Sequence, residues 1–104
     1  MKPFKGPYTY SKKIVEEWDS SSIGVYYIGT KTPENQLRIF YIGKAVSEGG
    51  VRKRLLEHLS ENKWNDATHF GYHFFEANDI KEIEEFEKTE ITKYKPKYNT
   101  VGLI

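Results

Sequence analysis

Two runs rich in β-branched and aromatic residues, 23–28 (IGVYYI) and 37–42 (LRIFYI), lie close together in the chain. A short polar segment that contains Gly29 and Pro33 joins them. Runs of this composition predict strands, and a short connection between two strands predicts an antiparallel hairpin. Neither run alternates strictly between polar and apolar residues, so we expect both faces of the sheet to be covered.

The rest of the chain predicts helices and one further strand around this hairpin. Their expected order is a helix from Ser11 to about Trp18, a helix over 51–62, a strand over 67–77 and a helix over 80–94. Asp79 is a typical N-cap for the last helix, and Pro96 ends it. We expect residues 1–10 to be irregular. The predicted fold is a small α/β (α+β) domain in which helices flank a three-stranded antiparallel sheet.

Length and composition exclude several classes of protein. A chain of 104 residues fits one domain. It has no cysteine, which excludes disulfides and thiolate metal sites, and its formal net charge of +1 gives no general attraction to nucleic acid. The first residues contain no apolar signal-peptide segment, and no apolar run is long enough to cross a bilayer. We therefore expect a cytoplasmic protein with no membrane partner.

One carboxylate lies on the apolar stripe of the helix expected over 80–94. Glu87 follows Ile83 by four residues and precedes Ile91 by four, whereas Glu90 falls at the edge of the stripe. An ionised carboxylate that is buried without a partner costs several kcal/mol. Two interpretations stay open: a salt bridge from Glu87 to a lysine at the sheet edge, or a site for one hard divalent cation such as Mg²⁺.

Basic and acidic residues are segregated along the chain. Positions 38–58 carry five Lys or Arg against two Glu, and positions 76–90 carry seven acidic residues against two Lys. Arg54 and His58 lie one helical turn apart beside the apolar stripe of their helix, and an arginine there can bind a phosphate in bidentate fashion. Taken alone, such a pair is more often part of a solvated helix face.

Together and in this order, these segments resemble the GIY-YIG nuclease family. GVY at 24–26 resembles the first motif, and YIG at 41–43 the second. The segment 52–58 (RKRLLEH) resembles the helix of the family that carries an arginine, and 86–99 resembles its closing segment. The resemblance covers about 22–100, and it is strongest to short single-domain members related to the nuclease module of the bacterial excision-repair incision subunit.

The domain boundaries follow from this match. Residues 1–21 would form an N-terminal segment with a short helix, 22–100 the nuclease-like domain, and 101–104 a C-terminal tail. The chain departs from the family pattern in two residues and in the length of one linker. Val25 replaces an isoleucine, Glu90 stands where an aliphatic residue is usual, and the linker before Arg54 is a few residues longer.

The resemblance implies a metal-dependent DNA endonuclease, with a role in DNA repair. Glu87 would hold a single Mg²⁺ or Mn²⁺, and Arg54 would stabilise charge on the phosphate in the transition state. Tyr26 would orient or deprotonate the attacking water, with Lys44 lowering its pKa. Tyr41 and His58 would contact the phosphate or assist proton transfer.

The remaining expectations concern structure and DNA contacts. Gly24, Gly43 and Asn99 would shape the site without taking part in the chemistry. The expected contacts to DNA are Lys44, Arg52, Lys53, Arg54, Lys95 and Lys97. Two alternatives to an autonomous nuclease stay open: a catalytically silent DNA-binding module that keeps the fold, and a nuclease subunit that needs a protein partner to hold its substrate.

Overall fold

The computed structural model describes residues 1–99, which form an α+β domain with one four-stranded antiparallel sheet and three helices. The elements are β1 (Lys5–Thr9), α1 (Lys12–Glu17), β2 (Gly24–Lys31), β3 (Leu37–Ala45), α2 (Gly50–Ser60), β4 (His69–Phe74) and α3 (Ile80–Tyr94). The strand order is β1-β4-β2-β3, so that β1 and β3 are the edges of the sheet. The expected tail over 101–104 lies outside the described residues.

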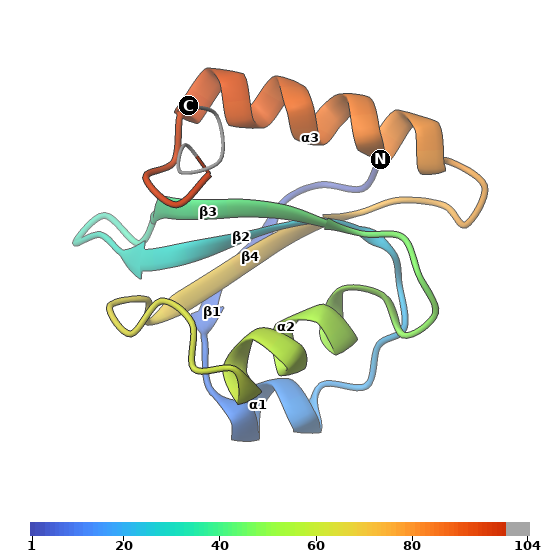
Figure 1. Cartoon of the computed structure of the whole chain (residues 1–104). Coiled ribbons are helices and arrows are strands. Elements are labelled where there is room, and N and C mark those ends of the chain that lie inside the picture. The colour runs from blue at the N-terminus through green and yellow to red at the C-terminus, as the bar shows by residue number, and fades with distance from the viewer. Residues whose placement is uncertain (100–104) are drawn as a thin grey trace.

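Helices cover both faces of the sheet, as the lack of alternation in its strands predicts. Figure 1 shows α3 on one face and α1 with α2 on the other. Two hydrophobic clusters follow from this arrangement. Val15, Tyr26, Ile28 and Leu55 belong to the cluster beneath α1 and α2, whereas Ile83 belongs to the cluster beneath α3.

The expected hairpin is present, because β2 and β3 pair in antiparallel register. Tyr26 lies opposite Gly43, and Val25 lies opposite Lys44. Residues directly opposite each other in such a ladder share a face. Tyr26 therefore points toward α2, and Lys44 points toward α3 on the other side of the sheet.

The expectation of three strands and an irregular N-terminus is wrong. Residues 5–9 form β1, an edge strand that pairs with β4. The pairing is interrupted between Lys5 and Tyr8 by a register shift, and Gly6 and Pro7 lie within this interval. A strand that contains glycine and proline and pairs on only one side has little of the composition that marks a strand in sequence.

The helix boundaries follow from local signals. The Ser11 side chain accepts a hydrogen bond from the backbone N–H of Ile14 at 3.2 Å, which caps α1. Asp79 precedes α3 as expected, although its side chain makes no capping hydrogen bond. At the other end of α3, Lys95 adopts a left-handed conformation with φ of 45° just before Pro96. Within residues 1–99, no helix has the length and apolar character needed to span a bilayer.

Candidate active site

A buried phenol–imidazole pair lies between β2 and α2. The Tyr26 hydroxyl lies 2.8 Å from Nε2 of His58, and the two residues are 0% and 2% exposed. Burial, with Arg54 acting in the same direction, lowers the pKa of His58 to about 4, so that the imidazole is neutral at pH 7. A neutral Nε2 that accepts the hydroxyl proton leaves the ring N–H on Nδ1, which is buried without a partner among the described residues.

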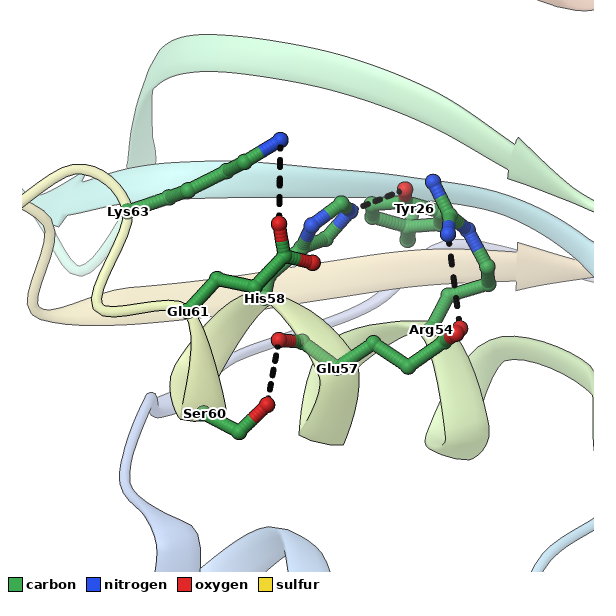
Figure 2. A network of polar contacts seen from close by, with 7 residues as sticks. All are labelled: Tyr26, Arg54, Glu57, His58, Ser60, Glu61 and Lys63. Carbon is green, nitrogen blue, oxygen red and sulfur yellow. Dashed lines mark hydrogen bonds and ion pairs between the residues drawn. The ribbon is translucent and has the colours of Figure 1, made fainter.

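Arg54 approaches this pair from the preceding turn of α2. Figure 2 shows its guanidinium directed toward the Tyr26 hydroxyl, while Nη1 lies 3.3 Å from a carboxylate oxygen of Glu57. Burial raises the pKa of Tyr26 far above its usual value, and the nearby guanidinium opposes that rise. Arg54 and Lys53 also line a small pocket of about 200 Å³ at the start of α2, together with Glu48 and Glu57.

Close packing around Gly43 fixes the position of the Tyr26 ring. A Cβ atom at position 43 would lie within 3 Å of both the Tyr26 and Tyr41 rings, so only glycine fits beneath the two phenols. The Asn99 side chain binds the backbone of Ile42, next to Gly43, through two hydrogen bonds. Its Oδ1 accepts a hydrogen bond from the Ile42 N–H at 2.7 Å, and its Nδ2 donates to the Ile42 carbonyl at 2.8 Å. The closing segment is thereby tied to the strand that carries YIG.

Lys44 and two glutamates of α3 form a second polar cluster on the opposite face of the sheet. The Lys44 ammonium lies 3.9 Å from a carboxylate oxygen of Glu87 and 4.0 Å from one of Glu84. Burial raises the pKa of Glu87, with Glu84 adding to the rise and Lys44 opposing it. The salt bridge expected as one interpretation of Glu87 is therefore present.

Tyr41 lies between the two clusters, on edge strand β3. Burial is the main reason that its pKa is raised, and the carboxylate of Glu87 raises it further. The guanidinium of Arg54 and the hydroxyl of Tyr26 act in the opposite direction. The pKa of the half-buried Tyr41 phenol is thus influenced by charged groups of helices on both faces of the sheet.

The expectation that Lys44 lowers the pKa of Tyr26 is wrong. Lys44 points toward α3, so the cation that acts on the Tyr26 phenol is Arg54, and burial outweighs its effect. A fully buried phenol of raised pKa is also a poor base for a water molecule in solvent. The sequence could not reveal this, because the two residues are offset by one place in the ladder and thus point to opposite faces.

Several of the cations expected to contact DNA already have partners within the protein. Arg52 donates a hydrogen bond to the backbone carbonyl of Glu16 at 2.9 Å, and the Lys97 ammonium lies 2.6 Å from Asp66. Lys53 and Lys95 are exposed. Lys44 and Arg54 pair with glutamates, as described above.

Trp64 is a site residue that sequence reasoning missed. Its ring stacks on Tyr41 with a centroid separation of 4.4 Å and meets the edge of His58 at 4.7 Å. The backbone at Trp64 has a φ of 56°, a left-handed conformation that places the ring back over the end of α2. A single tryptophan in the polar loop after α2 is the only sequence signal of this role.

Comparisons with models of known protein families, with curated proteins and with solved structures give no significant match to this chain.

The grouping of the described side chains limits the kind of metal site that the protein can form. Within residues 1–99, no three His, Cys, Asp or Glu side chains are grouped so that they could hold a metal ion together. A divalent ion here would therefore depend on one or two carboxylates, with water and substrate oxygens completing its coordination. Glu84 and Glu87 fit this requirement, because both approach a single cation, the Lys44 ammonium.

Proposed function

We propose that this chain is a divalent-metal-dependent DNA endonuclease of GIY-YIG-like fold that hydrolyses phosphodiester bonds and prefers branched DNA to plain duplex. The observation that carries the proposal is the position of Tyr41. The pKa of its half-buried phenol is shifted by both the Arg54 guanidinium and the Glu87 carboxylate, which come from helices on opposite faces of the sheet. A phenol, a guanidinium and a carboxylate are the groups that such a reaction needs, and here they come from β3 and from the two helices, α2 and α3, that contact it.

The carboxylates of α3 would hold the metal. Glu87 is the main candidate, because its side chain is only 17% exposed and its ion pair with Lys44 is long, at 3.9 Å. Glu84 is more exposed and approaches the same ammonium. A bound Mg²⁺ or Mn²⁺ would supply Lewis-acid stabilisation of the phosphate oxygens.

The residues of β2, β3 and α2 would position the substrate. Arg54 would bind a non-bridging phosphate oxygen and stabilise negative charge there. Tyr41 is the phenol that can reach a substrate, because it is partly exposed whereas Tyr26 is fully buried. Tyr26 and His58, which are buried, would hold Tyr41 and Arg54 in place from the interior of the domain.

Cleavage assays with a Glu87→Gln variant test the proposal. Wild-type protein is incubated with branched, nicked and linear DNA in Mg²⁺ or Mn²⁺. We expect cleavage by the wild type and none by Glu87→Gln, with similar unfolding curves for both. Glu85→Gln is the matched control, because it removes one exposed charge from the same helix and is expected to leave cleavage unchanged. Cleavage by Glu87→Gln at the wild-type rate would overturn the assignment of Glu87.

The Lys44–Glu87 ion pair favours a second candidate, a DNA-binding module without catalytic activity. A lysine already neutralises the carboxylate that a metal would need. This candidate predicts that the wild type binds branched DNA but leaves it intact in either metal. Cleavage that appears only when a protein from the same cell is added would instead indicate a partner-dependent subunit.

A further inference from the structure

A pocket of about 500 Å³ lies on the α3 face of the sheet, apart from the site around Tyr41. It is bounded by the N-terminal segment, the turn before β3 and the C-terminal half of α3. The residues that matter for its chemistry are Phe4, Tyr27, Ile39, His73, Glu90 and Tyr94. Tyr27 follows Tyr26 along β2 and therefore points to the other face of the sheet.

Glu90 is a buried carboxylate in the wall of this pocket. We expected it at the edge of the apolar stripe of α3, but it is only 9% exposed. One oxygen, Oε1, accepts a hydrogen bond from the Tyr27 hydroxyl at 2.6 Å. Among residues 1–99, neither a second hydrogen bond nor an ion pair to this carboxylate is found. The second oxygen, Oε2, is therefore available to a hydrogen-bond donor that enters the pocket.

Aromatic rings line the same pocket as the carboxylate. Phe4 lies 5.6 Å from Tyr27 and 5.5 Å from His73 between ring centroids, in edge-to-face geometry. Tyr94, at the rim, already attracts a cation, because the Lys93 ammonium lies 5.0 Å from its ring centroid. Aromatic faces beside a buried carboxylate favour a cation over a neutral molecule of the same shape.

We propose that this pocket binds an organic cation that carries a guanidinium group, either a free small molecule or the arginine side chain of a partner protein. The Oε2 oxygen of Glu90 would accept hydrogen bonds from the guanidinium, and the exposed ring of Tyr94 would contact one of its planar faces. A guanidinium suits the site better than an ammonium, because it is more weakly hydrated and stacks on aromatic rings. The pocket does not involve Tyr41, Arg54 or Glu87, so this inference is independent of the nuclease proposal.

Titration of the ¹⁵N-labelled chain with butylguanidine tests the inference. Butylurea is the matched probe, since it has nearly the same shape and no charge. We expect saturable shifts of amide signals in β3 and the C-terminal half of α3 with butylguanidine, and binding of butylurea at least about ten times weaker, the loss expected when a hydrogen-bonded charge is removed. Equal binding of the two probes, or no saturable shift with butylguanidine, would overturn the inference.

Variants of α3 give the second arm of the test. Glu90→Gln keeps an oxygen for the Tyr27 hydroxyl but removes the charge, and it should weaken butylguanidine binding at least about tenfold. Glu85→Gln, at an exposed position of the same helix, should leave binding unchanged. Wild-type affinity in Glu90→Gln would overturn the proposal. If that variant does not fold, the comparison of the two probes on the wild type decides by itself.

The source of the cation is distinguished with a short acetylated and amidated Gly-Arg-Gly peptide. Tighter binding of this peptide than of butylguanidine supports an arginine of a partner protein. Weaker binding supports a free small cation, because the pocket then rejects the flanking backbone.

Discussion

The hydrogen bond between Tyr26 and His58 is the buried polar contact on which the α2 face depends. Tyr26→Phe removes the hydroxyl and leaves Nε2 of His58 without a partner, in a residue that is 2% exposed. We expect a loss of about 1–3 kcal/mol in the free energy of unfolding, measured by urea denaturation. Tyr94→Phe is the matched control, because that side chain is 47% exposed, and we expect it to change stability by less than about 0.5 kcal/mol. Equal effects of the two substitutions would show that the buried bond contributes nothing.

The stability of the protein should depend on the protonation of His58. Its pKa is about 4 in the folded chain and 6.5 in an ordinary setting, so between these values the unfolded state binds the extra proton. Above pH 6.5 neither state carries it, and the folded state is favoured fully. As pH falls from 6.5 to 4, this group alone should lower the free energy of unfolding by about 3 kcal/mol.

Urea denaturation of the wild type and of His58→Gln across this pH range measures the effect. Glutamine does not titrate, and the carboxylates contribute equally to both proteins, so the difference between the two pH profiles isolates the histidine. Parallel profiles would contradict a neutral buried His58.

The burial of individual carboxylates on α3 is harder to predict from the sequence than the motifs are. Glu87 was singled out because an apolar helical stripe contained it, and the structure places it against Lys44. Glu90, expected at the edge, is the more buried of the two. The stripe is displaced: Ile80 in the first turn of α3 is 41% exposed and is absent from the cluster beneath α3, whereas Glu90 is buried. A helical wheel drawn from apolar residues alone cannot detect such a displacement.

At the scale of elements, prediction succeeded where local signals were strong. Helix α3 begins at Ile80 and ends at Tyr94, as Asp79 and Pro96 indicate. Strand β1 was missed, because it is short, pairs on one side only and contains Gly6 and Pro7. Its position at the edge depends on contacts with β4, which is more than fifty residues away in the chain.

Two glycines allow α2 to begin where it does. The position of Arg54 depends in turn on where that helix begins. Gly49 and Gly50 have φ angles of 93° and 62°, which other residues rarely adopt. A Cβ atom at position 50 would overlap the carbonyl oxygens of Ser21 and Ser22. These two glycines therefore let the helix begin against the segment before β2.

Gly50→Ala should consequently destabilise the protein. The left-handed backbone costs an alanine about 1 kcal/mol, and the overlap adds to it, so we expect a total loss of at least about 2 kcal/mol in urea denaturation. Glu48→Ala, at an exposed position of the same loop, should be nearly neutral. A stable Gly50→Ala would mean that the start of α2 can shift without cost.

At the scale of the whole molecule, positive and negative charges nearly balance, and several cations lie beside acidic groups. Acidic groups of α3 and of the loop before β4 lie against cations that were expected to contact DNA. Lys44 faces Glu84 and Glu87, and Lys97 faces Asp66. Pairing of this kind reduces the positive potential that a phosphate backbone would meet.

Binding to plain duplex DNA should therefore be weak. We expect a Kd of roughly 10⁻⁴ to 10⁻⁶ M at physiological salt, the range of sequence-independent contacts. With about three to five phosphates neutralised, the slope of log K against log salt should be roughly −3 to −4.5. Branched DNA should bind more tightly, because it can present a phosphate backbone to the α2 face and to the edge of β3 at once. Mg²⁺ should tighten binding of the wild type by neutralising Glu87, and it should not tighten binding of Glu87→Gln.

Fluorescence anisotropy across a salt series, with Glu87→Gln used to prevent cleavage, measures these quantities. Lys53→Ala, next to Arg54 in the pocket at the start of α2, should reduce the steepness of the slope by about one. Lys31→Ala, at the far end of β2, should leave it unchanged. Nanomolar binding to one linear duplex that barely responds to salt would mean that the domain reads bases, and that paired surface charges do not limit its affinity.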